Sequence, residues 1–277
     1  GDHRDLHRLI RRQRQMCIRD SACMKIGFPN NPRKDICKEI SWIGEHGFDF
    51  VDLFLEEDKA VPEKIDVYEV RKLLQTFNLD IVGHTAWYLP IGSPVRSLRQ
   101  TAVRELEKYF KVLSELGAKF VTVHANWPGG MFSAKEGIKF QVESLNFLID
   151  YAKSSDLKIM YEPMDTSEDN LENVSSILNE LPEIFLHIDI GHASLFGNTP
   201  EIFIKKFHSR IKHVHLHDND KRKDLHLPLD CGKIEWRNII KTLKKYYDGT
   251  ITLEIFSKDR DYVLLSKEKL RKAWKES

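Results

Sequence analysis

The chain has 277 residues, 41% of them hydrophobic, and its 43 Lys and Arg almost balance 42 Asp and Glu, for a formal net charge of +1. This composition excludes disordered and collagen-like proteins, and the balanced charge gives no reason to expect a nucleic acid as partner. No stretch approaches the roughly 20 apolar residues of a membrane-spanning helix, so no membrane partner is predicted. One globular domain is expected.

Residues 1–23 differ from the rest of the chain. They contain six Arg and no Lys, and they lack the apolar centre of a signal peptide and the composition of a transit peptide. The segment RQMCIRDS resembles translated sequencing-adapter sequence. We therefore predict a non-native or disordered extension over residues 1–23, a natural start at Met24 and one domain over residues 24–277; a disordered basic arm is the alternative. Because residues 1–23 contain six Arg and three Asp, the remainder carries a net charge of −2.

The cysteines indicate a reducing compartment. Cys17 and Cys23 belong to the N-terminal extension, and Cys37 and Cys231 are far apart without a CxxC spacing. This pattern favours a cytoplasmic protein and gives no thiolate-bound metal.

From Met24 onward, short apolar runs alternate with amphipathic stretches of helical length. Strands are predicted at residues 24–28, 50–55, 80–84, 119–124, 157–162, 185–189, 211–217 and 250–256. Two of the intervening helices are expected over residues 33–46 and 98–116, where apolar side chains recur at helical spacing. Eight such units, starting roughly 26 to 40 residues apart, predict a closed (β/α)8 TIM barrel. A doubly wound open sheet is the alternative, but no GxGxxG turn follows a strand.

Six of the predicted strands end on side chains that bind metals. These are His84, His124, Glu162, Asp189 with His192 three residues later, His215 and Glu254. A barrel brings the carboxyl ends of its strands to one rim, where so many carboxylates and imidazoles would repel one another without a cation. We therefore expect a divalent metal at this rim, Zn²⁺ or Mn²⁺, with one certain site and room for two or three.

The seventh predicted strand supports this hypothesis. His213, His215 and His217 alternate with aliphatic residues, which places the three imidazoles on one face, toward the barrel interior. Asp224 and His226 follow as a D-x-H pair in the next loop, where they could complete a second or third cation site.

These motifs resemble the xylose-isomerase-like TIM-barrel superfamily, which includes sugar-phosphate isomerases and epimerases and the endonuclease IV group of apurinic/apyrimidinic endonucleases. The resemblance rests on HVHLHDND and DLHLPLDCGKIEW, with GHTAWYLP and HIDIGH in support. In the isomerase branch it implies one cation held by Glu162, Asp189, His215 and Glu254. The endonuclease branch has further metal ligands, and the resemblance places them at His84, His124, His192, Asp224 and His226.

The charge of the chain favours the isomerase branch. A duplex-binding nuclease needs many basic contacts to phosphate, whereas residues 24–277 carry −2 and the loop after the seventh strand is rich in Asp. We predict a metal-dependent sugar or sugar-phosphate isomerase or epimerase, with an endonuclease IV-like zinc phosphodiesterase as the alternative. Its partner is then a small sugar rather than DNA, and the sequence leaves the oligomeric state open.

The resemblance also implies individual roles. Glu162 and Glu254 would be ligands as well as the acid/base pair that moves a proton next to a carbonyl. The predicted substrate-binding residues are His192, His217, Trp87 and Trp127.

Overall fold

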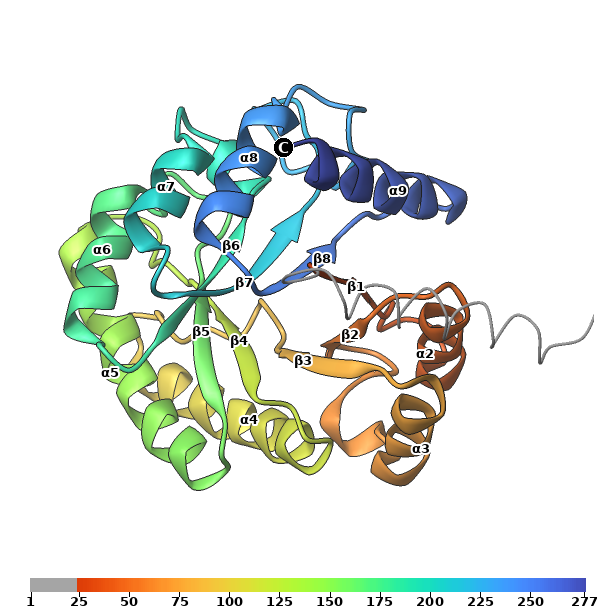
Figure 1. Cartoon of the computed structure of the whole chain (residues 1–277). Helices are drawn as coiled ribbons and strands as arrows, with labels where there is room; N and C mark the ends of the chain where they lie inside the picture. Colours follow the sequence, from red (N-terminus) through yellow and green to blue (C-terminus); the bar gives the residue numbers. More distant parts are fainter. Residues whose placement is uncertain (1–23) are drawn as a thin grey trace, which may run out of the picture.

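Eight parallel strands pair in sequence order, and the last closes on the first to form a barrel surrounded by helices (Figure 1). The structure is a computed structural model that describes residues 24–277. It confirms the predicted (β/α)8 TIM barrel. The prediction of a non-native or disordered extension concerns residues 1–23, which lie outside the described residues.

The elements follow the expected alternation. The strands are β1 (Lys25–Pro29), β2 (Phe50–Phe54), β3 (Asp80–His84), β4 (Phe120–His124), β5 (Lys158–Glu162), β6 (Phe185–Asp189), β7 (Ile211–Leu216) and β8 (Thr250–Leu253). The helices are α2 (Ile36–Glu45), α3 (Val67–Phe77), α4 (Arg96–Glu115), α5 (Ala134–Ser154), α6 (Leu171–Glu180), α7 (Pro200–Phe207), α8 (Trp236–Tyr246) and α9 (Asp261–Glu276), with short 3-10 helices η1 (Pro62–Lys64) and η2 (His192–Ser194).

The eighth strand is shorter than predicted. Its prediction extended to Phe256, but the strand ends at Leu253. The amide of Glu254 still donates to the carbonyl of Leu216 on β7, at 3.1 Å, but the amide of Phe256 donates to the carbonyl of His226 in the loop after β7, also at 3.1 Å. Glu254 therefore lies just past the strand, where the loop carrying the D-x-H pair comes back over the rim.

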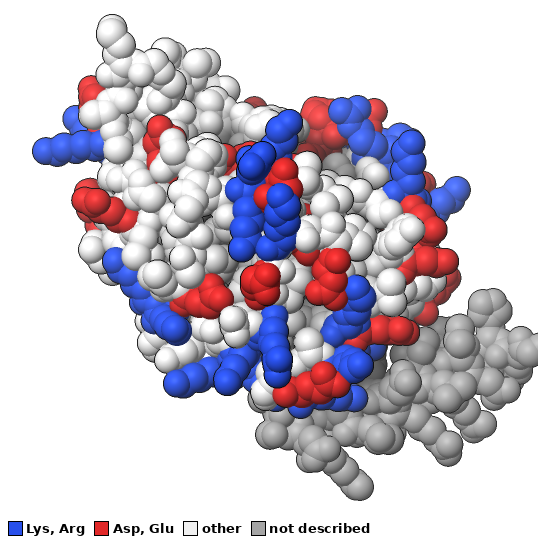
Figure 2. Space-filling view, turned by 90° about the horizontal axis from the view of Figure 1, so that it is seen from above, with Lys and Arg blue, Asp and Glu red and all other residues white. Residues whose placement is uncertain are grey.

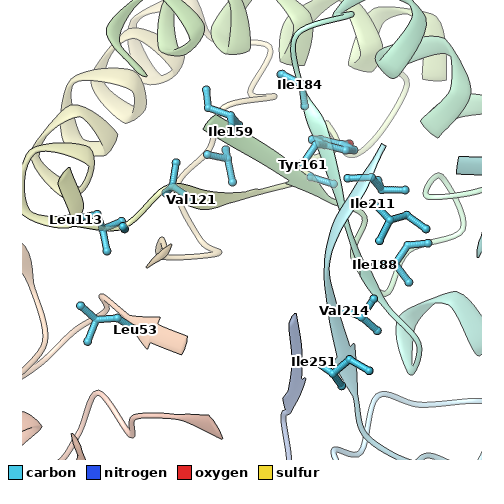
Figure 3. Close-up of a cluster of buried hydrophobic side chains, with 14 of the residues drawn as sticks. Leu53, Leu113, Val121, Ile159, Tyr161, Ile184, Ile188, Ile211, Val214 and Ile251 are labelled. Atoms are coloured by element: carbon cyan, nitrogen blue, oxygen red, sulfur yellow. The ribbon is translucent and has the colours of Figure 1, made fainter. Parts of the chain in front are cut away.

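The core lies between the barrel and its helices. Alternate strand residues point outward and are almost fully buried against the helical layer, as Figure 3 shows for Val121, Ile159, Ile188, Val214 and Ile251. The inward-facing residues of the same strands are mostly polar. Because side chains alternate across a strand, the aliphatic residues stabilise the fold and leave the inner positions available for chemistry.

The floor of the barrel, at the amino ends of the strands, is apolar. Phe50, Val82 and Met160 form a small separate cluster of buried side chains. Gly27 allows this cluster to pack, because a Cβ at Gly27 would lie 2.3 Å from the ring of Phe50. The floor closes the lower end of the barrel, so the polar residues above it are reached from the opposite rim.

The surface has mixed charge. Basic and acidic side chains are interleaved over the face seen in Figure 2. Within residues 24–277, no helix is long and apolar enough to cross a membrane.

Candidate metal centre

Four side chains from different strands meet around one imidazole nitrogen. The Nδ1 atom of His215, on β7, lies 3.0 Å from an oxygen of Glu254, 3.7 Å from one of Asp189 and 3.9 Å from one of Glu162. These residues come from β5, β6, β7 and the end of β8, and they are at most 7% exposed. The structure therefore brings together all four side chains that were predicted to share one cation.

A second group lies beside the first. His84 and His124, the last residues of β3 and β4, face each other with 2.7 Å between their Nε2 atoms. The same Nε2 atoms are 3.7 Å and 3.2 Å from Oε2 of Glu162. Glu162 thus belongs to both groups, and its two oxygens face different sets of imidazoles.

The third group is built around the D-x-H pair. Asp224 lies 2.7 Å from Nε2 of His226, 3.3 Å from Nε2 of His217 and 3.5 Å from Nε2 of His192. Together these four residues offer ligand atoms that all lie within 4.8 Å of one another. Gly191 is required here, because a Cβ at this position would lie 1.9 Å from the ring of His217.

The two imidazoles that were predicted to bind substrate both lie in the third group. His217 is 0% exposed and lies 3.0 Å from Asp189 as well as beside Asp224. His192 is 8% exposed and also faces Asp224. Both positions also suit metal ligands.

The donor set fits a divalent cation. Several buried polar atoms of the described residues have no hydrogen-bond partner, and among them are atoms that face these groups: Oε2 of Glu162, Oδ2 of Asp189, Nε2 of His217 and Oδ1 of Asp224. Leaving such atoms unsatisfied costs about 1–3 kcal/mol each. Imidazole nitrogen and carboxylate oxygen are the ligands of Zn²⁺ and Mn²⁺, so bound cations would satisfy these atoms.

The buried carboxylates and imidazoles of the centre shift one another's pKa values. Burial alone would raise the pKa of Glu162, but His187 and His124 outweigh it and hold the pKa well below its usual range. Burial would likewise lower the pKa of His215, yet Glu254 and Asp52 raise it well above its usual value. Neighbouring groups thus outweigh the effect of burial on the pKa at both residues.

Sequence reasoning missed two inward-facing residues below the rim. Asp52, in the middle of β2, is 0% exposed and bonds to His215 and His213. His187, on β6, lies 3.1 Å from Glu162 and 3.0 Å from the hydroxyl of Thr122. The alternation of side chains along each strand could have revealed both residues. His187 lies two positions before Asp189, and Asp52 lies two positions from Phe50 and Phe54, so each shares a face with the residues that flank it.

The two predicted tryptophans lie in loops above the rim. Trp87 follows β3, is 55% exposed and packs edge-on against Tyr88, with 5.8 Å between ring centroids. Trp127 follows β4, and its Nε1 donates to Asp169 at 2.8 Å. Burial raises the pKa of Asp169 to about 7, against the opposing hydrogen bonds from Thr166 and Trp127.

The family model of the xylose isomerase-like TIM barrel matches residues 40–277. An uncharacterized protein of Methanocaldococcus jannaschii is 27% identical over 232 residues and covers 76% of each chain. The fructoselysine 3-epimerase of Escherichia coli O157:H7 is 21% identical over 202 residues, which cover 68% of this chain and 73% of that enzyme. An inosose dehydratase of Clostridium beijerinckii is 27% identical over 218 residues, with coverages of 70% and 68%.

Solved structures share the whole barrel. A D-tagatose 3-epimerase-like protein superposes with a TM-score of 0.82 at 25% identity, over 91% of this chain and 97% of that one. The IOLI protein with a bound zinc atom superposes with a TM-score of 0.73 at 18% identity, over 91% and 96%. The relatives with assigned activities are thus sugar epimerases and inosose dehydratases.

Proposed function

Because the chain belongs to the xylose isomerase-like TIM barrel family, we propose that it is a divalent-metal-dependent sugar isomerase or epimerase. The observation that carries this proposal is the convergence of Glu162, Asp189 and Glu254 on Nδ1 of His215, each within 4.0 Å. The epimerase relatives support the reaction class. The proposal covers both free sugars and sugar phosphates. The two free cysteines of the described chain favour the cytoplasm as the location of the protein.

The proposed cation is Zn²⁺ or Mn²⁺. When bound, it would polarise the carbonyl of a sugar and so acidify the neighbouring C–H bond. The residues that would hold it are Glu162, Asp189, His215 and Glu254. The zinc atom in the IOLI structure supports zinc as the first metal to test.

Glu162 and Glu254 are the proposed acid/base pair. They reach the centre from β5 and from the end of β8, on different sides of His215, so one can remove a proton from a carbon and the other can return one. Trp127, fixed by its bond to Asp169, is the proposed apolar contact for the sugar, and Trp87 is a second one in the neighbouring loop.

One observation supports the alternative function. The second and third groups hold His84, His124, His192, Asp224 and His226, and they adjoin the first group closely enough for further cations. A centre with two or three metals suits phosphodiester hydrolysis, in which cations generate a hydroxide and stabilise the leaving oxygen. An endonuclease IV-like phosphodiesterase therefore remains the second candidate.

Two assays separate the candidates. The metal-loaded protein is incubated with a panel of ketoses in D₂O, and deuterium incorporation next to the carbonyl is followed by NMR. In parallel, an oligonucleotide with an abasic site is tested for incision at several salt concentrations. Exchange that disappears in Glu162→Gln and in Glu254→Gln supports the isomerase. Salt-sensitive incision without exchange on any sugar refutes it and favours the nuclease.

A further inference from the structure

We infer that Asp52 is a positioning residue that orients His215 so that Nδ1, and not Nε2, is the atom presented to the cation. This inference rests on the proposed metal site. It assigns a role to a buried carboxylate that lies on the opposite side of the barrel, 163 residues away in the chain.

The two nitrogens of His215 face different surroundings. Nε2 lies only 2.6 Å from Oδ2 of Asp52, a short contact that indicates a charge-assisted hydrogen bond. Nδ1 faces the carboxylates of Glu254, Asp189 and Glu162. An acceptor at Nε2 requires a proton there, so the neutral ring keeps its lone pair on Nδ1, toward the carboxylates that would share the metal.

Asp52 is itself held by a chain of hydrogen bonds. Its Oδ2 also accepts from the hydroxyl of Thr252 at 2.9 Å and from Nε2 of His213 at 3.1 Å. Because Nε2 of His213 donates, its Nδ1 accepts from the hydroxyl of Thr250, at 2.7 Å. Asp52, His213 and Thr252 are all 0% exposed, so water does not compete for these bonds.

The other rim imidazoles present the opposite nitrogen. His84 and His124 face each other and Glu162 through Nε2, and His226 faces Asp224 through Nε2. The Nδ1 of His226 is 3.0 Å from the backbone carbonyl of Glu254, to which it donates. His215 is therefore distinguished by its ligand atom, and the residue responsible for the difference is Asp52.

Zinc affinity tests the positioning role directly. Full-length protein is stripped of metal, and Zn²⁺ binding is measured by competition with a chromophoric chelator for the wild type, Asp52→Asn and Glu39→Gln. Glu39 is the matched control, since it is a 5% exposed carboxylate that bonds to Arg260 and to the amide of Asn31, outside the metal centre. Loss of an outer carboxylate typically weakens metal binding by 10–100-fold. We expect a weakening of about 10-fold or more for one zinc equivalent in Asp52→Asn and no change in Glu39→Gln.

The wild-type protein provides a second test that does not depend on the folding of a variant. The protein is labelled with ¹⁵N-histidine and loaded with ¹¹³Cd²⁺, and the coupling between cadmium and ring nitrogens identifies each ligand atom. A coupled Nδ1 supports the inference. If every coupled nitrogen is an Nε2, or if Asp52→Asn folds and binds Zn²⁺ as tightly as the wild type, the inference is wrong. If the wild type binds neither metal, the proposed metal-dependent function itself fails.

Discussion

Replacing Asp169 with Asn is expected to flatten the pH dependence of stability. The carboxyl is 3% exposed, and its burial raises the pKa from 3.8 to about 7 in the folded protein. Between these values the folded protein holds a proton that the unfolded chain has lost, so the wild type loses stability as the pH rises. Above pH 7 both states are ionised and the loss is complete. Asn carries no such proton, so the variant does not suffer this loss.

The size of the effect follows from the shift. About three pKa units correspond to about 4 kcal/mol, of which about 2.5 kcal/mol is lost between pH 5 and pH 8. For a domain of this size, 1 kcal/mol changes the Tm by about 2–4 °C. The Tm of Asp169→Asn relative to the wild type is therefore expected to rise by about 5–10 °C between pH 5 and pH 8. Any constant cost of the weaker hydrogen bonds from Trp127 and Thr166 cancels in this difference.

The assay is thermal unfolding followed by circular dichroism at several pH values. Asp165→Asn is the matched control, because Asp165 lies exposed in the same loop. A difference between Asp169→Asn and the wild type that stays constant from pH 5 to pH 8 would refute the reasoning. The same result in both variants would mean that the loop, and not the buried carboxyl, is responsible.

Four other predictions concern the centre, the core and the terminus. Chelation is expected to lower the Tm, and free Zn²⁺ at 100 times its Kd to stabilise the protein by about 2.7 kcal/mol; an unchanged Tm would count against a bound cation. Gly191→Ala forces His217 aside, so we expect weaker zinc binding and a loss of about 1–3 kcal/mol in chemical unfolding, whereas Gly129→Ala, with open space around it, is the neutral control. Ile251→Ala, at an outward core position that is 0% exposed, is expected to cost about 2–5 kcal/mol in the same measurement; a cost below 1 kcal/mol would contradict the described packing. Deleting residues 1–23 is expected to leave both Tm and activity unchanged, and a clear loss of either would assign those residues a role.

The sequence by itself determined the barrel and its rim. Inward and outward positions alternate along each strand, so His213 and His215 could be placed on the inner face from β7 alone, next to the outward Val214. The parallel βα order then placed the strand ends at one rim, which located Glu162 and Asp189 near each other before any distance was known. These conclusions depend on the local periodicity of side chains and on the order of strands and helices along the chain, and both can be read from the sequence.

Only the tertiary structure decided which side chains meet across the barrel. Asp52 contacts His213 and His215 from 161 and 163 residues away, and no local pattern encodes that pairing. It depends on the closure of β1 against β8 and on the stagger of the strands, which set the height of each inner residue. The burial of His217 has a similar cause, because the loop that covers it is held by a bond between Phe256 and His226, residues that come together only once the barrel is closed.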